Sequence, residues 1–119
     1  MALYTVTSKR DGVIVLYCSG ALVFGDESIA LRSLVRELLN ECRHVVLDLR
    51  DVVRIDSGGL GTLVSLYASA RNVGGAIKLS GADRRVNELL QMTKLLVLFE
   101  VFDKAEDAVA SFDKTDKDA

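Results

Sequence analysis

The sequence has no proline, no tryptophan, only two cysteines and a single histidine in 119 residues. Without proline, the shape of the loops depends on glycine. Cys18 and Cys42 lie in apolar, periodic segments, which is typical of small buried side chains in a reducing compartment and predicts a cytoplasmic protein. A disulfide between them stays open at this point. His44, beside Arg43, has no second histidine and no cysteine at ligand spacing, so we expect a solvated turn residue and no metal site.

An excess of positive charge and a long hydrophobic run are also missing. Fifteen Lys and Arg against seventeen Asp and Glu give a net charge of −2, which argues against direct binding of nucleic acid. The longest strongly apolar run, residues 95–99, is far too short to span a membrane. Residues 1–5 lack the charged and apolar segments of a secretory signal. We therefore expect neither a membrane partner nor secretion.

What is present fits one domain. Half of the residues are hydrophobic and 27% are charged, the balance of an ordinary globular protein. We predict a single domain over residues 1–113 and a polar C-terminal tail over 114–119.

The first half of the chain predicts a hairpin and a helix. Residues 3–8 and 13–18 flank Asp11-Gly12, a turn signal that predicts a β-hairpin. From Asp26, apolar residues recur at helical spacing, and Asp26 or Ser28 could cap this helix.

The second half continues the alternation. We predict a strand over 45–49 that ends at Arg50-Asp51, a helix whose pattern begins at Leu60 and stops near Gly74-Gly75, and a strand over 76–80. Three further segments follow: a short helix around 86–90, a short strand or buried loop over 95–102, and a last helix after the capping-box spacing of Asp103–Glu106. The fold class is therefore α/β, with a mixed β-sheet of about five strands and about four α-helices packed against it.

The most informative segment is Asp56-Ser57-Gly58-Gly59-Leu60-Gly61, between a strand and a helix. A helix N-terminus has free N–H groups and favours negative charge. Gly58 and Gly59 carry no side chains, so another molecule can approach the backbone closely. Ser57 is either the N-cap of the helix or a hydroxyl displayed for phosphorylation.

Three other chemistries are weaker. A serine hydrolase needs a base for Ser57, and the only histidine lies on a separate connection. A dinucleotide site needs a third glycine after Gly59 and Gly61, and Val64 stands there instead.

A magnesium site could use Asp48, Asp51 and Asp56, which follow one strand closely. The alternative is structural. Asp48 and Asp51 would satisfy backbone groups at the strand exit, and Asp56 would order the turn by hydrogen bonds. We favour the structural interpretation, with no metal and no cofactor.

With these segments placed, the chain resembles the STAS family, the anti-sigma factor antagonists and their relatives. The resemblance covers almost the whole chain and rests on five segments: Val45–Leu49 with Ile55–Gly61, Ser19–Leu22, Arg71–Gly75 with Ile77–Leu79, Val86–Leu95, and Phe99–Phe112. It implies a mixed sheet with helices and a non-enzymatic binding module. In stand-alone members of this family, the protein binds an anti-sigma factor that is also a serine kinase, and so releases a sigma factor.

The resemblance also implies how binding is regulated. The kinase phosphorylates the first serine of the family motif Asp-Ser-x-Gly-Leu-Gly, and a metal-dependent serine phosphatase reverses this. Ser57 occupies that position, and Gly58 stands where the family often has a second serine. We expect a partner-binding surface of ten residues at the ends of parallel strands: Phe24, Gly25, Asp26, Asp56, Ser57, Gly58, Gly59, Leu60, Gly61 and Val64.

The sequence departs from the family at Val23–Ser28, where many antagonists carry an Asp and a Thr/Asn-Ala pair. This leaves the identity of the partner open. Phe24 is the least secure member of the surface, because an aromatic residue beside a glycine is more often buried than in contact with a partner. The rival interpretation is a constitutive STAS subunit of a stress-signalling or lipid-transport assembly, in which the serine is not modified.

Overall fold

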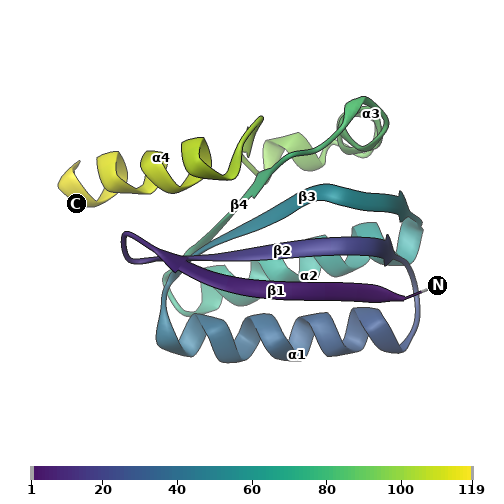
Figure 1. Ribbon diagram of the computed structural model, residues 1–119, viewed down its shortest axis with the longest axis horizontal. Helices are drawn as coiled ribbons and strands as arrows, with labels where there is room; N and C mark the ends of the chain where they lie inside the picture. Colours follow the sequence, from purple (N-terminus) through teal and green to yellow (C-terminus); the bar gives the residue numbers. More distant parts are fainter. Residues whose placement is uncertain (1, 119) are drawn as a thin grey trace.

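The computed structural model describes the backbone of residues 2–118 and the side chains of residues 2–112. Its centre is a five-stranded mixed sheet with the order β1-β2-β3-β4-β5 (Figure 1). The β1–β2 pair is antiparallel, and every later pair is parallel. The strands are β1 (Leu3–Arg10), β2 (Val13–Leu22), β3 (His44–Ile55), β4 (Ala76–Ser80) and β5 (Val101–Phe102). The predicted α/β class, hairpin and mixed sheet are confirmed.

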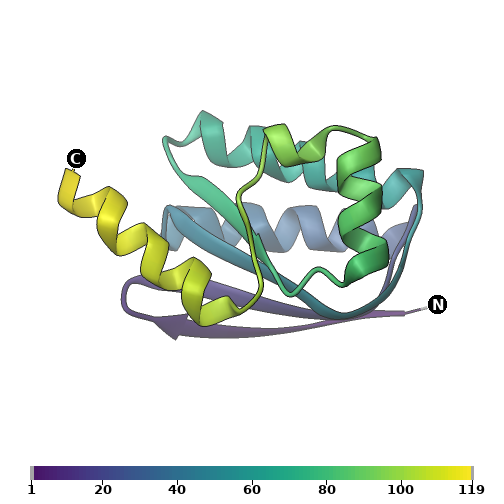
Figure 2. The ribbon, with the colours of Figure 1, turned by 90° about the horizontal axis from the view of Figure 1, so that it is seen from above.

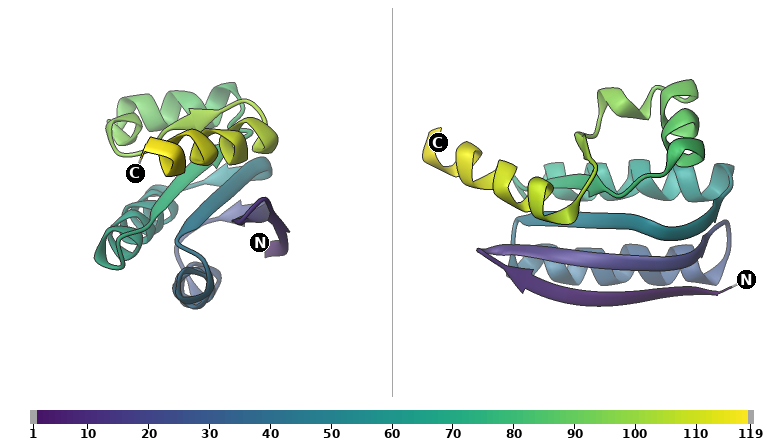
Figure 3. Two further views of the ribbon diagram at one scale, coloured as in Figure 1. Left: turned by 90° about the vertical axis from the view of Figure 1, so that its left-hand side faces the viewer. Right: turned by 45° about the horizontal axis from the view of Figure 1, so that its top comes forward.

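Within residues 2–118, four α-helices and one short 3₁₀ helix connect and follow these strands. They are α1 (Asp26–Glu41), α2 (Ser57–Asn72), α3 (Arg84–Met92), η1 (Leu95–Val97) and α4 (Ala105–Asp118). Right-handed crossovers between neighbouring parallel strands place successive helices on one face. Accordingly α1 and α2 lie together below the sheet in Figure 1, whereas α4 lies above it, as the turned views of Figures 2 and 3 also show.

The sheet has a hydrophobic core on each face. The larger core lies toward α1 and α2 and includes Leu16, Leu47, Leu63 and Leu79, all without exposed surface. The second core lies under α4. Its strand side chains are Val13, Val15 and Val46, and its helix side chains are Ala105, Ala108, Val109 and Phe112. Both faces of β2 and β3 are therefore apolar, as expected of central strands.

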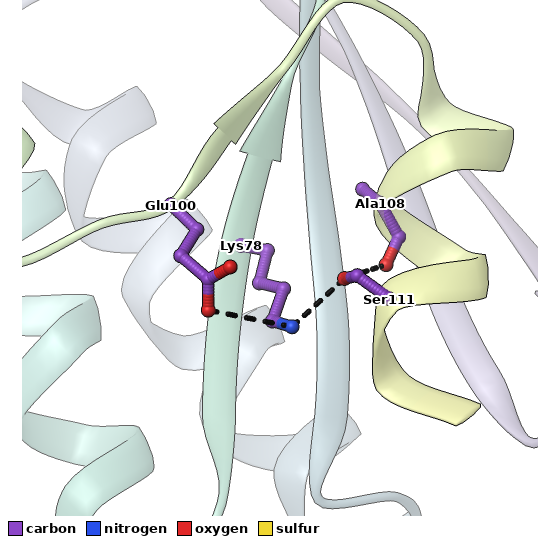
Figure 4. A network of polar contacts seen from close by, with 4 residues as sticks. All are labelled: Lys78, Glu100, Ala108 and Ser111. Carbon is purple, nitrogen blue, oxygen red and sulfur yellow. Dashed lines mark hydrogen bonds and ion pairs between the residues drawn. The ribbon is translucent and has the colours of Figure 1, made fainter. Parts of the chain in front are cut away.

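A buried lysine lies between β4 and α4 (Figure 4). Lys78 is 6% exposed, and its Nζ donates a hydrogen bond of 2.8 Å to Ser111 Oγ. The same Nζ lies 3.5 Å from a carboxylate oxygen of Glu100 and 4.3 Å from the ring centroid of Phe112. These contacts compensate the ammonium for the water it has lost, and they link β4 to α4.

The strand β3 is longer than predicted. Arg50 and Asp51 do not end it, because the pairing with β2 continues to Ile55 through two register shifts. Such bulges allow polar residues to remain in a paired strand. His44 belongs to the start of β3, and its ring stacks on Phe112 with a centroid distance of 4.5 Å. The prediction of a solvated turn residue at His44 was therefore wrong.

The ends of two helices also differ from prediction. Gly25, at φ 137°, is the N-cap of α1, and neither Asp26 nor Ser28 caps it. The Ser28 hydroxyl instead donates to the carbonyl of Val23. α4 begins at Ala105, one residue later than the capping box of Asp103 predicts, and it continues across residue 113 to Asp118. Residue 119 of the predicted tail lies outside the described residues.

The two cysteines are free thiols. Cys18 is buried as expected, and this burial, aided by the nearby charge of Asp48, raises its thiol pKa to about 12. Cys42 lies just beyond the end of α1 and is half-buried. In the described part of the chain, no helix has both the length and the apolar character that a membrane crossing requires.

Candidate functional site

The hexapeptide lies at the junction of β3 and α2, on the side of the molecule where β2 and β3 both end (Figure 1). β2 and β3 run parallel, with Leu22 opposite Ile55. The loop from β2 to α1 and the start of α2 are therefore neighbours, as the strand arrangement predicts. The site is built from these two segments.

One carboxylate joins the two segments. Asp56 is the N-cap of α2, and its Oδ1 accepts a hydrogen bond of 2.8 Å from the N–H of Gly59. The N–H of Phe24, on the other segment, donates to the same carboxylate at 3.0 Å and 3.2 Å. The bond from Gly59, followed by those from Phe24 and Gly58, lowers the pKa of Asp56, so this residue is ionised at neutral pH. The predicted ordering of the turn by Asp56 is confirmed.

The two glycines are required by a close approach within the chain itself. A Cβ at position 59 would lie 2.0 Å from the carbonyl oxygen of Leu22, and one at position 58 would lie 2.5 Å from the Cβ of Phe24. On the Cβ side of both glycines the chain itself already occupies the space, so no other molecule can approach from there. Approach of a partner to the backbone of Gly58 from another direction stays a prediction. Gly61, by contrast, faces open space.

Ser57 is the first residue of α2 and is exposed to solvent. It is not the N-cap, since Asp56 has that role. Within the described residues its hydroxyl has no hydrogen-bond partner. The structure therefore leaves Ser57 as a displayed hydroxyl at a helix N-terminus.

The ten residues expected to bind a partner fall into two groups. Ser57, Gly61, Val64, Phe24 and Asp26 are exposed. Phe24, the least secure member of the expected surface, is 83% exposed: its backbone N–H is held by Asp56, and its ring lies outside the core.

The other five members of the predicted surface are less accessible. Gly25, Asp56, Gly58 and Leu60 are half-buried, and Gly59 is buried. Gly59 therefore lies beneath the surface that a partner would contact.

The sequence reasoning missed a polar contact between α1 and α2. Arg32 Nη2 lies 3.4 Å from Thr62 Oγ1, which itself donates to the carbonyl of Gly58 at 3.0 Å. The Nε of Arg32 is buried and has no hydrogen-bond partner among the described residues. The two partners are 30 residues apart, and no local pattern in the sequence indicates their pairing.

Of the remaining acidic candidates, Asp48 has the structural role that was expected. Asp48 is 4% exposed; one of its carboxylate oxygens accepts from the N–H of Arg50 at 3.0 Å, and the other accepts from Ser80 Oγ at 2.9 Å. Asp51 is exposed. In the part of the chain that is described, no three His, Cys, Asp or Glu side chains gather as a metal site would require.

The comparison with known protein families decides the assignment. Residues 4–108 match the STAS domain. The chain belongs to the STAS domain family. An anti-sigma F factor antagonist of Paenibacillus polymyxa is 24% identical over 114 residues, which cover 95% of this chain and 97% of that protein.

Solved structures of STAS proteins share the fold. An anti-sigma factor antagonist from Mycobacterium paratuberculosis superposes with a TM-score of 0.79 at 20% identity, over 92% of this chain and 93% of its own. The anti-sigma factor antagonist SpoIIAA in its unphosphorylated form superposes with a TM-score of 0.69 at 14% identity, over 95% of this chain and 98% of its own. At these identities the likeness concerns the fold.

Proposed function

We propose that this STAS protein is a cytoplasmic anti-sigma factor antagonist that phosphorylation of Ser57 switches off. In its unmodified form it binds an anti-sigma factor that is also a serine kinase, and a sigma factor is released. The kinase phosphorylates Ser57, and a metal-dependent serine phosphatase restores the active form. The protein itself is a non-enzymatic binding module without a cofactor.

One observation carries the proposal. Ser57 combines an exposed hydroxyl without a hydrogen-bond partner in the described chain with the first position of a 16-residue helix. A kinase can reach such a hydroxyl without unfolding the turn, because the hydrogen bonds that hold the turn belong to Asp56. The family membership and the antagonist relative support the same role.

The switch would act at the surface. A phosphate adds a charge of about −1.5 to −2 at neutral pH. Asp56 already accepts the hydrogen bond of the Gly59 N–H, so a phosphate on Ser57 would point into solvent beside an ionised carboxylate. If repulsion and desolvation of this charge in the contact surface together cost about 3–4 kcal/mol, the affinity for the partner falls by a few hundredfold.

The rival function is a constitutive subunit of a stress-signalling or lipid-transport assembly. In that case Ser57 would not be modified, and the same surface would bind a permanent partner. Phosphorylation of Ser57 by an anti-sigma factor kinase separates the two functions.

The first prediction is that Ser57 is the only phosphoacceptor. The purified anti-sigma factor serine kinases of the source organism are incubated with the protein and ATP, and phosphopeptides are mapped by mass spectrometry. We expect a single modified site that disappears in Ser57→Ala. Phosphorylation that persists in Ser57→Ala would contradict the prediction.

The second prediction concerns affinity. Calorimetric titration of the same kinases with wild type and Ser57→Ala should give nearly equal affinities. The Ser57 hydroxyl forms no hydrogen bond within the described residues, so its removal leaves the surface in place. Ser57→Glu should bind at least about tenfold more weakly, a difference of about 1.4 kcal/mol. Equal affinity for all three proteins, or no binding to any kinase, would favour the constitutive subunit.

A further inference from the structure

A groove lies beside the Ser57 surface, between the end of β3 and α3. Its volume is about 530 Å³, and it is lined by Val53, Arg54, Ile55, Arg85, Val86 and Leu89. Figure 1 shows α3 above the end of β3 and the start of α2 below it, so both helices lie at the same end of this strand. None of the residues predicted to bind a partner lines this groove.

The floor of the groove is apolar and partly open to solvent. Val53 is 53% exposed although it belongs to a strand, and Ile55 and Leu89 are half-buried. The Arg85 side chain donates to the carbonyl of Val53, which fixes α3 against the strand end. The two walls are therefore held together before any partner binds.

The rim of the groove is positively charged. Arg54 and Arg85 are both exposed, and neither forms an ion pair within the described residues. The nearby Glu88 forms an ion pair with Arg84 instead, with 3.3 Å between Glu88 Oε1 and Arg84 Nε. An apolar floor beside two exposed guanidinium groups that form no ion pair among the described residues fits an apolar side chain flanked by carboxylates.

The groove is also continuous with the Ser57 surface. Val53, Arg54 and Ile55 are followed directly by Asp56 and Ser57, and the charge of Arg54 acts on Asp56. A partner that covers Ser57 therefore reaches the groove within a few residues.

We propose that this groove binds an apolar side chain flanked by carboxylates on the anti-sigma factor kinase. The inference rests on the proposed function and extends its contact surface to α3. It also gives the phosphate a direct target, since a negative charge on Ser57 repels the carboxylates that the two arginines attract.

The test compares paired variants in calorimetric titrations of the anti-sigma factor kinase that binds the wild-type protein. Val53→Asp places a carboxylate on the groove floor. Its control is Val73→Asp, a 40% exposed valine at the far end of α2. Arg54→Glu reverses a charge on the rim, and its control is Arg36→Glu, an exposed arginine in the second half of α1.

We expect Val53→Asp and Arg54→Glu to bind at least about tenfold more weakly, and both controls to bind within about twofold of wild type. The affinity of wild type should also fall with salt more steeply than that of Arg54→Glu. Because Val53 and Arg54 are both exposed, the melting temperatures of the two variant proteins should stay near that of wild type. If one variant does not fold, the other still tests the groove.

If both variants bind as their controls do while Ser57→Glu still binds weakly, the groove is not part of the interface and the proposed function stands. If only Arg54→Glu keeps its affinity, the acidic character of the partner is overturned. If Ser57→Glu binds like wild type, the proposed function fails first.

Discussion

At the scale of single residues, the site depends on how closely two chain segments can approach. The Asp56 carboxylate holds the N–H of Phe24, and this is possible only because Gly58 and Gly59 leave room for the β2–α1 loop. The family position that often carries a second serine is occupied by Gly58, whose Cβ would meet Phe24 at 2.5 Å. A serine side chain at position 58 would therefore obstruct the approach of the β2–α1 loop that Gly58 allows.

A pair of glycine substitutions tests this packing. Gly59→Ala should destabilise the protein by about 2–3 kcal/mol, because its Cβ would lie 2.0 Å from the carbonyl oxygen of Leu22 and the backbone must shift. Gly61→Ala is the control in the same helix turn. It faces open space and should stabilise the protein by roughly 0.5–1 kcal/mol through helix propensity. Urea unfolding gives both values, and equal effects at the two positions would contradict the close approach.

At the scale of elements, α4 is held by its own small core. Phe112 is 1% exposed, stacks on His44 and lies under the ammonium of Lys78. Lys78 also links α4 to the segment before β5, because its ammonium contacts both Ser111 on α4 and Glu100 (Figure 4). The packing of α4 therefore centres on the Phe112 ring.

Removal of that ring should be costly. We expect Phe112→Ala to lower the free energy of unfolding by about 3–5 kcal/mol, because it removes a fully buried ring and leaves a cavity between α4 and the sheet. Val97→Ala, at a residue that is 84% exposed, should change it by less than about 0.5 kcal/mol. A loss below about 1 kcal/mol in Phe112→Ala would show that α4 contributes little to the stability of the domain.

The elements that the sequence predicted well are those with a clear period. The Asp11-Gly12 hairpin and the apolar stripe of α1 have local signals, and both are present. The predicted end of β3 was wrong. Polar Arg50 and Asp51 interrupt the apolar pattern there, but the pairing with β2 continues through bulges. Local sequence patterns do not contain the register of a neighbouring strand.

The candidate site shows the same division. The position of Ser57 at a helix N-terminus followed from the glycines and the strand before it. The bond from the Phe24 N–H to Asp56 joins residues 32 positions apart, so no local pattern in the sequence indicates it. Likewise the groove against α3 joins residues about 30 positions apart along the chain, so it emerges only when the sheet is assembled.

At the scale of the whole molecule, the proposed switch requires that modification changes the surface and leaves the fold unchanged. We expect Ser57→Asp to unfold within roughly 1 kcal/mol of wild type, a shift in melting temperature of only a few degrees for a domain of this size. The positive end of α2 stabilises the new carboxylate, and the neighbouring ionised Asp56 repels it. Both effects on stability are small at an exposed position. Calorimetric melting of wild type, Ser57→Ala and Ser57→Asp measures this directly. If Ser57→Asp melts far below the other two, Ser57 is a structural residue of the turn, and weaker binding of any acidic variant would then reflect unfolding of the site instead of repulsion at its surface.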